Sequence, residues 1–415
     1  ATDPQFGTAR KAAADAGSLI TLPARSYVLP GFVDLHIHAP QYPQLGAALD
    51  VPLEVWLHKY TFPLEARYAD LEFAAKAYGQ LIEDLPANGT TAAVMFATVH
   101  REATQLLAEL AINKGMRAYV GKVVMDDPTA CPDYYRDASP EEAEAETQAF
   151  IDHLRNHPKN RDGRVQPVIT PRFIPSCSDE ALSRLGALAQ RTGCHVQTHC
   201  SASDWEHGFV LARHGCSDTD SLDRFGLLTR RTVLAHSNLL SDRDMELIRT
   251  RGAGVAHCPL SNAYFSNAVF PLRAALEKGV RVGLGTDISG GPSASIFDGM
   301  RMGVAASRML EDGVDPNKAP GQRGRLRSRI NWQDAFHLAT AGGADVLELQ
   351  SGHFAVGQNF DAIVIDAASP DGTVRLIEPG LAPEEILARI IYTASKPNIT
   401  QTIVAGETIH GGKAQ

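Results

Sequence analysis

The chain has 415 residues, of which 44% are hydrophobic and 21% charged, and its formal net charge is −9 at pH 7. This composition is ordinary for a globular protein, and the negative balance argues against binding to nucleic acid or to an anionic membrane surface. No apolar run approaches the roughly 20 residues of a membrane span, and the N-terminal start lacks the apolar core of a signal peptide, so we expect a cytoplasmic protein.

The first strong element is a strand predicted over residues 30–38. A Pro-Gly turn signal opens it, and apolar and polar residues then alternate. Side chains two apart on a strand point to the same side, so His36 and His38 face one point. Residues 39–66 are predicted to form a long loop whose aromatic side chains are candidates to line a pocket for a flat ligand.

From residue 68 onward, helical and strand-like segments alternate. Helices are predicted over 68–85, 101–114, 140–157, 179–192, 204–214, 242–251 and 270–278. Strands are predicted over 89–96, 117–121, 165–170, 194–199, 232–236, 253–257 and 280–287. With the first strand this makes eight, which indicates an α/β fold of the (β/α)8 TIM-barrel type. Periodicity alone leaves an open doubly wound sheet as the alternative.

The terminal segments are predicted to build a small β-domain from residues 1–29 and 358–415, beside a barrel of residues 30–357. Its predicted strands are 18–22, 360–366, 391–392 and 402–406. Residues 312–328, rich in Pro, Gly and Arg, are predicted to form a flexible loop.

Five side chains with metal-ligand chemistry follow the predicted strands at their carboxyl ends. They are His36, His38, His199, His236 and Asp287. In a barrel those ends converge on the face where active sites lie. Nitrogen and oxygen ligands without cysteine favour zinc, with ferrous iron as the alternative, in a catalytic site that keeps an open position. Such a site lowers the pKa of a bound water.

The motifs around these residues resemble the amidohydrolase superfamily, and within it the guanine deaminase branch. The superfamily is indicated by His36-Ile37-His38 and by Gly285-Thr286-Asp287. The branch is indicated by Gln41-Tyr42, by Lys59-Tyr60-Thr61-Phe62-Pro63 and by Pro171-Arg172-Phe173.

This resemblance implies one zinc ion held by His36, His38, His199 and Asp287, with His236 hydrogen-bonded to the attacking water and Asp287 also acting as the base. It implies that Gln41 and Arg172 hydrogen-bond the purine edge and that Phe173 stacks on or walls the ring. The expected reaction is hydrolytic deamination of guanine to xanthine and ammonia. For Arg172 a structural ion pair is the competing interpretation, and His257 is expected to support the site or the core. A homodimer is implied as well.

One position departs from the family pattern. The family has His-x-x-Glu after the fifth strand, where the Glu shuttles protons, but here His199-Cys200-Ser201-Ala202 places a methyl group at that position. General acid–base catalysis is worth roughly 10²–10⁴-fold in rate, so we expect the chain to be strongly impaired. We favour an engineered Glu-to-Ala variant over a divergent enzyme or a dead relative. Asp204 and Glu206 are nearby, but we expect them at a different height and azimuth on the next helical turn.

Two further expectations follow from the sequence. The six cysteines are scattered singly, which favours free thiols over disulfides. Relatives carry more residues before the first barrel strand, so we expect a shortened N-terminus. The alternatives to guanine deamination are an aminohydrolase for 8-oxoguanine, a pterin or an s-triazine, and a catalytically dead metal-binding relative.

Overall fold

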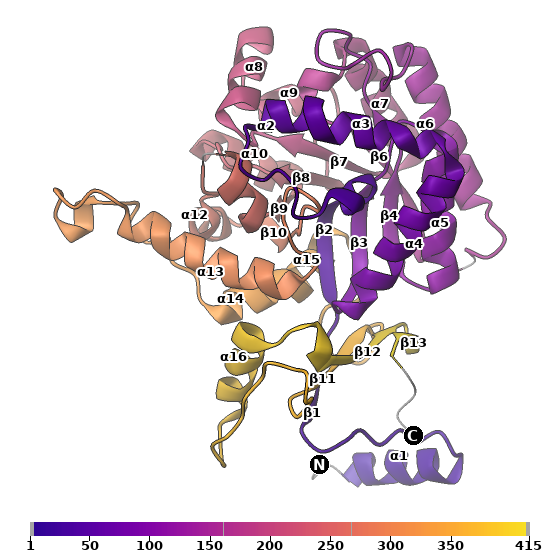
Figure 1. Ribbon diagram of the computed structural model, residues 1–415, viewed down its shortest axis with the longest axis vertical. Coiled ribbons are helices and arrows are strands. Elements are labelled where there is room, and N and C mark those ends of the chain that lie inside the picture. Colours follow the sequence, from indigo (N-terminus) through magenta and orange to yellow (C-terminus); the bar gives the residue numbers. More distant parts are fainter. Residues whose placement is uncertain (1–3, 161, 267, 412–415) are drawn as a thin grey trace.

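Eight parallel strands form a barrel with helices on its outer face (Figure 1). The computed structural model describes residues 4–160, 162–266 and 268–411. The barrel strands are β2 (Phe32–His38), β3 (Thr90–Phe96), β4 (Arg117–Gly121), β6 (Val165–Pro171), β7 (His195–Cys200), β8 (Thr232–His236), β9 (Gly254–His257) and β10 (Arg281–Leu284). The short strand β5 (Val123–Val124) pairs with β6. Each barrel strand pairs with its neighbour in chain order, as the (β/α)8 prediction requires.

The barrel closes between β2 and the segment that follows β10. The backbone N–H of Asp287 donates to the carbonyl of His36 at 2.9 Å, and the N–H of His38 donates to the carbonyl of Ile288 at 2.8 Å. This seam excludes the open doubly wound sheet. It also brings the first and last barrel strands together at their carboxyl ends.

The helices predicted between the strands are present. They are α4 (Leu71–Ala87), α5 (Arg101–Lys114), α6 (Pro140–Arg155), α7 (Asp179–Thr192), α8 (Asp204–His214), α10 (Asp242–Arg251) and α12 (Leu272–Glu277). Four of them begin at a serine whose side chain accepts a backbone N–H, namely Ser139, Ser178, Ser203 and Ser241. Such a cap satisfies one of the free donors of the first turn.

The remaining helical segments complete the outer layer and the loops. They are α9 (Asp218–Arg224), α11 (Pro259–Ser261), α13 (Ile296–Asp312), α14 (Trp332–His337), α15 (Gly343–Val346), η4 (Ile174–Ser176), η5 (Asn262–Ser266), η6 (Pro320–Gln322), η7 (Leu338–Gly342) and η8 (Lys396–Asn398).

The connection over 39–66 is not the loop that the sequence predicts. It consists of η1 (Ala39–Gln44), α2 (Leu53–Trp56), the π-helical η2 (Leu57–Thr61) and α3 (Phe62–Ala66), and η3 (Arg67–Ala69) follows. Four of these five segments have fewer than six residues and η1 has six, too short for a helical period to stand out in the sequence.

A four-stranded antiparallel sheet lies at one end of the barrel (Figure 1). Its order is β1 (Ser26–Pro30), β11 (Ala362–Asp366), β12 (Ile399–Val404) and β13 (Glu407–His410). Arg117 on β4 and Asp361 form a two-hydrogen-bond ion pair at 2.7 and 3.2 Å, which ties this sheet to the barrel.

Two strand predictions in the terminal segments are wrong. Residues 18–22 form no strand, and α1 (Pro4–Asp15) precedes them. Residues 391–392 lie inside α16 (Pro383–Thr393), which buries Ile390 and Ile391 and leaves Tyr392 exposed. The domain boundaries themselves stay a prediction.

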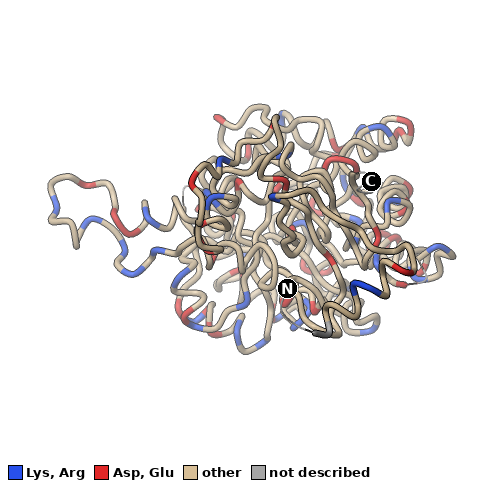
Figure 2. Tube along the Cα trace, turned by 90° about the horizontal axis from the view of Figure 1, so that it is seen from below, with Lys and Arg blue, Asp and Glu red and all other residues tan. Residues whose placement is uncertain are grey.

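After α13 the chain projects from the body (Figure 1, orange). Lys and Arg are numerous along this projection, where Asp and Glu occur as well, and both signs of charge are mixed along the rest of the chain (Figure 2). All six cysteines are free thiols, as predicted. In the described part of the chain, the helices are all too short or too polar to cross a membrane.

Candidate active site

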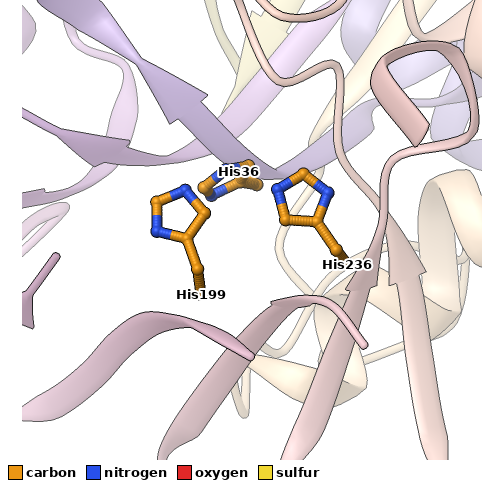
Figure 3. A group of neighbouring side chains, drawn as sticks. All are labelled: His36, His199 and His236. Atoms are coloured by element: carbon orange, nitrogen blue, oxygen red, sulfur yellow. The ribbon is translucent and has the colours of Figure 1, made fainter. Parts of the chain in front are cut away.

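The structure brings all five predicted ligands together at the carboxyl end of the barrel. His36, His199 and His236 gather around one point (Figure 3), and His36, His38 and Asp287 form an overlapping group. The Nε2 atoms of His38 and His199 are 3.0 Å apart. Asp287 Oδ1 lies 3.2 Å from His36 Nε2 and 3.8 Å from His38 Nε2.

This spacing fits a small divalent metal. Four donors at 2.0–2.2 Å from one tetrahedral ion stand roughly 3.3 Å from one another, close to the separations observed. The buried Nε2 atom of His36 makes no well-formed hydrogen bond with any described residue, although it faces the centre of the group. His36, His38, His199 and Asp287 therefore form a donor set that an ion would complete.

Hydrogen bonds behind the cluster fix the orientation of two histidines. Nδ1 of His199 lies 2.6 Å from the carbonyl oxygen of Arg172, and Nδ1 of His236 lies 2.9 Å from Oδ1 of Asn262. A carbonyl oxygen accepts, so each Nδ1 donates and each Nε2 is left as a lone pair. Asn262 in turn donates to Asn238, and Asn238 donates to the carbonyl of Ala202.

Burial sets the protonation of the cluster. Desolvation lowers the pKa of His38 and of His199 well below the ordinary value, and it lowers the pKa of His236 as well. Burial alone would raise the pKa of Asp287, but His36 and His236 outweigh it and the pKa is lowered. Neutral imidazoles beside an ionised carboxylate are the forms that bind a metal.

Four residues that carry or flank the site have left-handed backbone. The φ angles are 47° at Ser201, 69° at His236, 57° at Ser237 and 52° at Asp287. Such angles are rare for residues with a side chain and concentrate at functional sites. The angles at His236, Ser237 and Asp287 turn the chain sharply at the ends of β8 and β10, so that His236 and Asp287 reach the barrel axis.

A cavity opens onto the cluster. Gln41, Arg172, Phe173 and Ala202 all line it, together with His38, His199, His236 and Asp287. Trp56, Leu57 and Phe265 supply apolar walls. An apolar cavity with a few convergent polar groups suits a flat, polar-edged ligand.

Arg172 is both a cavity residue and a member of an ion pair. Its Nη1 and Nη2 atoms donate to Glu65 at 2.6 and 3.1 Å, and Glu65 is fully buried. Its guanidinium also lies 5.1 Å from the centre of the Phe62 ring. Glu65 is not predicted as a site residue from the sequence, because nothing in its short helix indicates that its side chain faces inward.

Ala202 lies in the cavity wall, but its neighbours differ from the prediction. Asp204 is exposed, whereas Glu206 is buried and lines the same cavity as Ala202. The side chain of Glu206 folds back over the start of α8, where its Oε2 accepts the N–H of Ala202 at 2.9 Å. The expectation that Glu206 lies away from this position is therefore wrong.

His257 is buried at the end of β9 and lies outside the metal cluster. Its ring centre is 5.2 Å from that of Phe270, and burial lowers its pKa to about 3. It remains a neutral core residue.

Comparison with known proteins agrees with this geometry. The profile of the amidohydrolase family matches residues 27–409. A probable guanine deaminase of Schizosaccharomyces pombe is 38% identical over 390 residues, spanning 93% of this chain and 72% of that protein. The guanine deaminase of Homo sapiens is 36% identical, over 92% of this chain and 83% of its own.

The similarity extends to solved structures. The crystal structure of a guanine deaminase from C. acetobutylicum with bound guanine in its active site superposes with a TM-score of 0.83 at 32% identity, covering 94% of this chain and 90% of that one. Family, sequence and fold agree over almost the whole length. The chain belongs to the amidohydrolase family and, within it, to the guanine deaminases.

Proposed function

We propose that this fold catalyses the zinc-dependent hydrolysis of guanine to xanthine and ammonia. The observation that carries the proposal is a single cavity. It is lined by residues of the cluster that fits a metal ion, and by Gln41 and Arg172, which can hydrogen-bond the edge of a purine. The guanine-bound relative from C. acetobutylicum supports the choice of substrate.

The reaction breaks the bond between a ring carbon and its exocyclic amine nitrogen and forms a carbon–oxygen bond from water, so that ammonia leaves and the ring stays intact. A bound Zn²⁺ supplies Lewis acidity that makes hydroxide available near neutral pH. His236 hydrogen-bonds the attacking water through Nε2, since its Nδ1 is committed to Asn262. Asp287, which the neighbouring histidines keep ionised, would accept the proton that the water loses.

The purine is held by the remaining cavity residues. Arg172 donates to the ring carbonyl oxygen, and Gln41 donates and accepts along the edge. Phe173, which is 7% exposed, offers the ring an aromatic wall next to His199. The apolar walls exclude bulk water and strengthen these hydrogen bonds.

Ala202 interrupts the reaction at one step, which is the delivery of protons to the ring nitrogen and to the leaving amine. A methyl group carries no proton, and Oε2 of Glu206 is engaged by the Ala202 N–H. We therefore propose that the chain binds metal and guanine but turns over guanine slowly.

We further propose that the chain forms a homodimer and that it acts in the cytoplasm. Sedimentation of the purified protein tests the homodimer.

The test is the substitution Ala202→Glu, assayed by ammonia release from guanine with zinc loaded. We expect a gain of roughly 10²–10⁴-fold, the usual worth of a positioned acid–base group. 8-Oxoguanine, a pterin and an s-triazine serve as competing substrates. No gain would contradict the proposed role of position 202, and a large preference for another heterocycle would contradict guanine as the substrate.

A further inference from the structure

A buried carboxylate connects the two residues proposed to bind the purine edge. Glu65 on α3 is fully buried and accepts three hydrogen bonds. Its Oε2 accepts from Arg172 Nη1, and its Oε1 accepts from Arg172 Nη2 and from Gln41 Nε2 at 2.8 Å. Both oxygens are thus occupied by side chains that line the cavity.

Glu65 also determines which way the Gln41 amide points. The amide nitrogen faces the carboxylate, and the amide oxygen accepts the N–H of Ser289 at 3.3 Å. The reverse orientation would set the Gln41 oxygen against a carboxylate and its NH₂ group against an N–H donor. One N–H and one lone pair of Gln41 remain for a ligand.

The same carboxylate fixes the plane and the charge of Arg172. Burial by itself lowers the pKa of Arg172, but the charge and hydrogen bonds of Glu65 outweigh it, so the pKa is raised. The two parallel hydrogen bonds set the guanidinium plane. Arg172 is 2% exposed, so the pair is largely shielded from water.

The partners come from distant parts of the barrel. Gln41 and Glu65 lie in the connection between β2 and β3, and Arg172 directly follows β6. The connectivity of the chain does not by itself hold these two segments at a fixed distance from each other. Glu65 joins them into one rigid wall.

We propose that Glu65 is a positioning residue that sets guanine selectivity by orienting Arg172 and Gln41 toward the oxo-substituted edge of the purine. The inference rests on the proposed function. Glu65 itself touches no substrate, because it is not among the residues that line the cavity and contacts two that are, Gln41 and Arg172. Its removal leaves both donors in place but without a fixed direction.

The experiment measures purine binding to the zinc-loaded chain by calorimetry, which is feasible because the chain has Ala202 at the proton-carrier position. The probes are guanine and 2-aminopurine, which lacks the ring oxygen that Arg172 would contact. Glu65→Gln removes the charge and keeps the volume. We expect the guanine Kd to rise about 10–100-fold, the worth of a hydrogen bond to a charged group, and the 2-aminopurine Kd to change less than about threefold.

The matched control is Asp361→Asn, which removes a buried carboxylate from the Arg117 pair at the opposite end of the barrel. We expect it to lower the melting temperature while the ratio of guanine to 2-aminopurine affinity stays at the parent value. Zinc content is measured in every variant and should remain one equivalent.

The outcomes separate the two proposals. Guanine binding by the parent together with an unchanged affinity ratio in Glu65→Gln would overturn the role of Glu65 alone. A parent that binds neither purine would overturn the proposed function and this inference with it. If Glu65→Gln does not fold, Glu65→Asp is the second variant, which keeps the charge but is one methylene shorter. We expect the same drop in the ratio of guanine to 2-aminopurine affinity, because the shorter side chain cannot reach both partners.

Discussion

His236 shows how much of the site depends on residues behind the ligands. Its ring is oriented by a chain of amides, from Asn262 to Asn238 to the carbonyl of Ala202. This chain connects the end of β8 to the loop that carries position 202. Substitution of either asparagine therefore alters the direction of His236 Nε2, although neither asparagine is proposed to contact the substrate.

We expect Asn262→Ala, made together with Ala202→Glu, to lower kcat by about 10–100-fold and to leave guanine affinity nearly unchanged. The physical reason is that His236 loses the acceptor that fixes its tautomer. Steady-state kinetics and calorimetry measure the two quantities. Asn398→Ala, which removes an equally buried asparagine of η8, just before strand β12 of the small sheet, is the control and should lower stability only.

Candidate metal ligands are easier to predict from the sequence than the residues that orient them. His199 and His236 stand at the ends of strands that alternation predicts, so their convergence follows from the barrel. Glu65 and its partner Arg172 are 107 positions apart in the sequence, and no local pattern marks that contact. Burial and long-range pairing are properties of the folded chain.

At the scale of elements, the start of α8 is the point where the fold and the chemistry overlap. Ser203 caps the helix by accepting the N–H of Glu206, and Glu206 returns a bond to the N–H of Ala202. Burial, and next the nearby charge of Asp218, raise the pKa of Glu206 well above its ordinary value. The carboxyl thus caps the turn at the cost of being desolvated.

This cost gives a pH-dependent prediction. The folded-state pKa of Glu206 lies above the unfolded value, so the folded state binds more protons and its stability falls as pH rises above about 4.5. We expect Glu206→Gln to raise the melting temperature near pH 8 and to leave it unchanged near pH 4, where the parent carboxyl is protonated in both states.

Thermal unfolding at both pH values tests the assignment. Ser203→Ala is the comparison variant, because loss of a neutral cap lowers stability by about 1 kcal/mol at either pH. A stabilisation by Glu206→Gln that is equal at both pH values would show that ionisation is not its cause.

The sequence predicts a helix best where a glycine marks its end, as Gly115 does for α5 and Gly193 for α7. Helix α5 matches its predicted range of 101–114, and α7 matches 179–192. The predictions that fail concern short or terminal segments. The helices within 39–66 have too few residues for a period, and residues 391–392 are too short a segment to distinguish a strand from the helix α16 in which they lie.

At the scale of the whole molecule, the metal cluster bridges the seam that closes the barrel. His36 and His38 belong to the first strand, and Asp287 follows the last. An ion bound there would add a cross-link to the two backbone hydrogen bonds of the seam. Binding that occurs only in the folded state stabilises it by mass action.

We expect removal of zinc by a chelator to lower the melting temperature, with a loss of about 4 kcal/mol if the free ion had stood a thousandfold above its Kd. Hydrogen exchange should accelerate at the backbone amides of His38 and Asp287 before it does in the small sheet. Uniform acceleration across the chain would contradict a local role of the ion at the seam. Re-addition of zinc serves as the control for irreversible damage.

The seam has a consequence for how the protein is made. Asp287 lies 251 residues after His36 (287 − 36), so the ribosome adds the last ligand roughly 10–50 s after the first. Until then the amino-terminal histidines have no partner across the seam and hold no complete donor set. A metal ion held by all of these side chains would therefore be captured late, at one of the last and most non-local steps of folding.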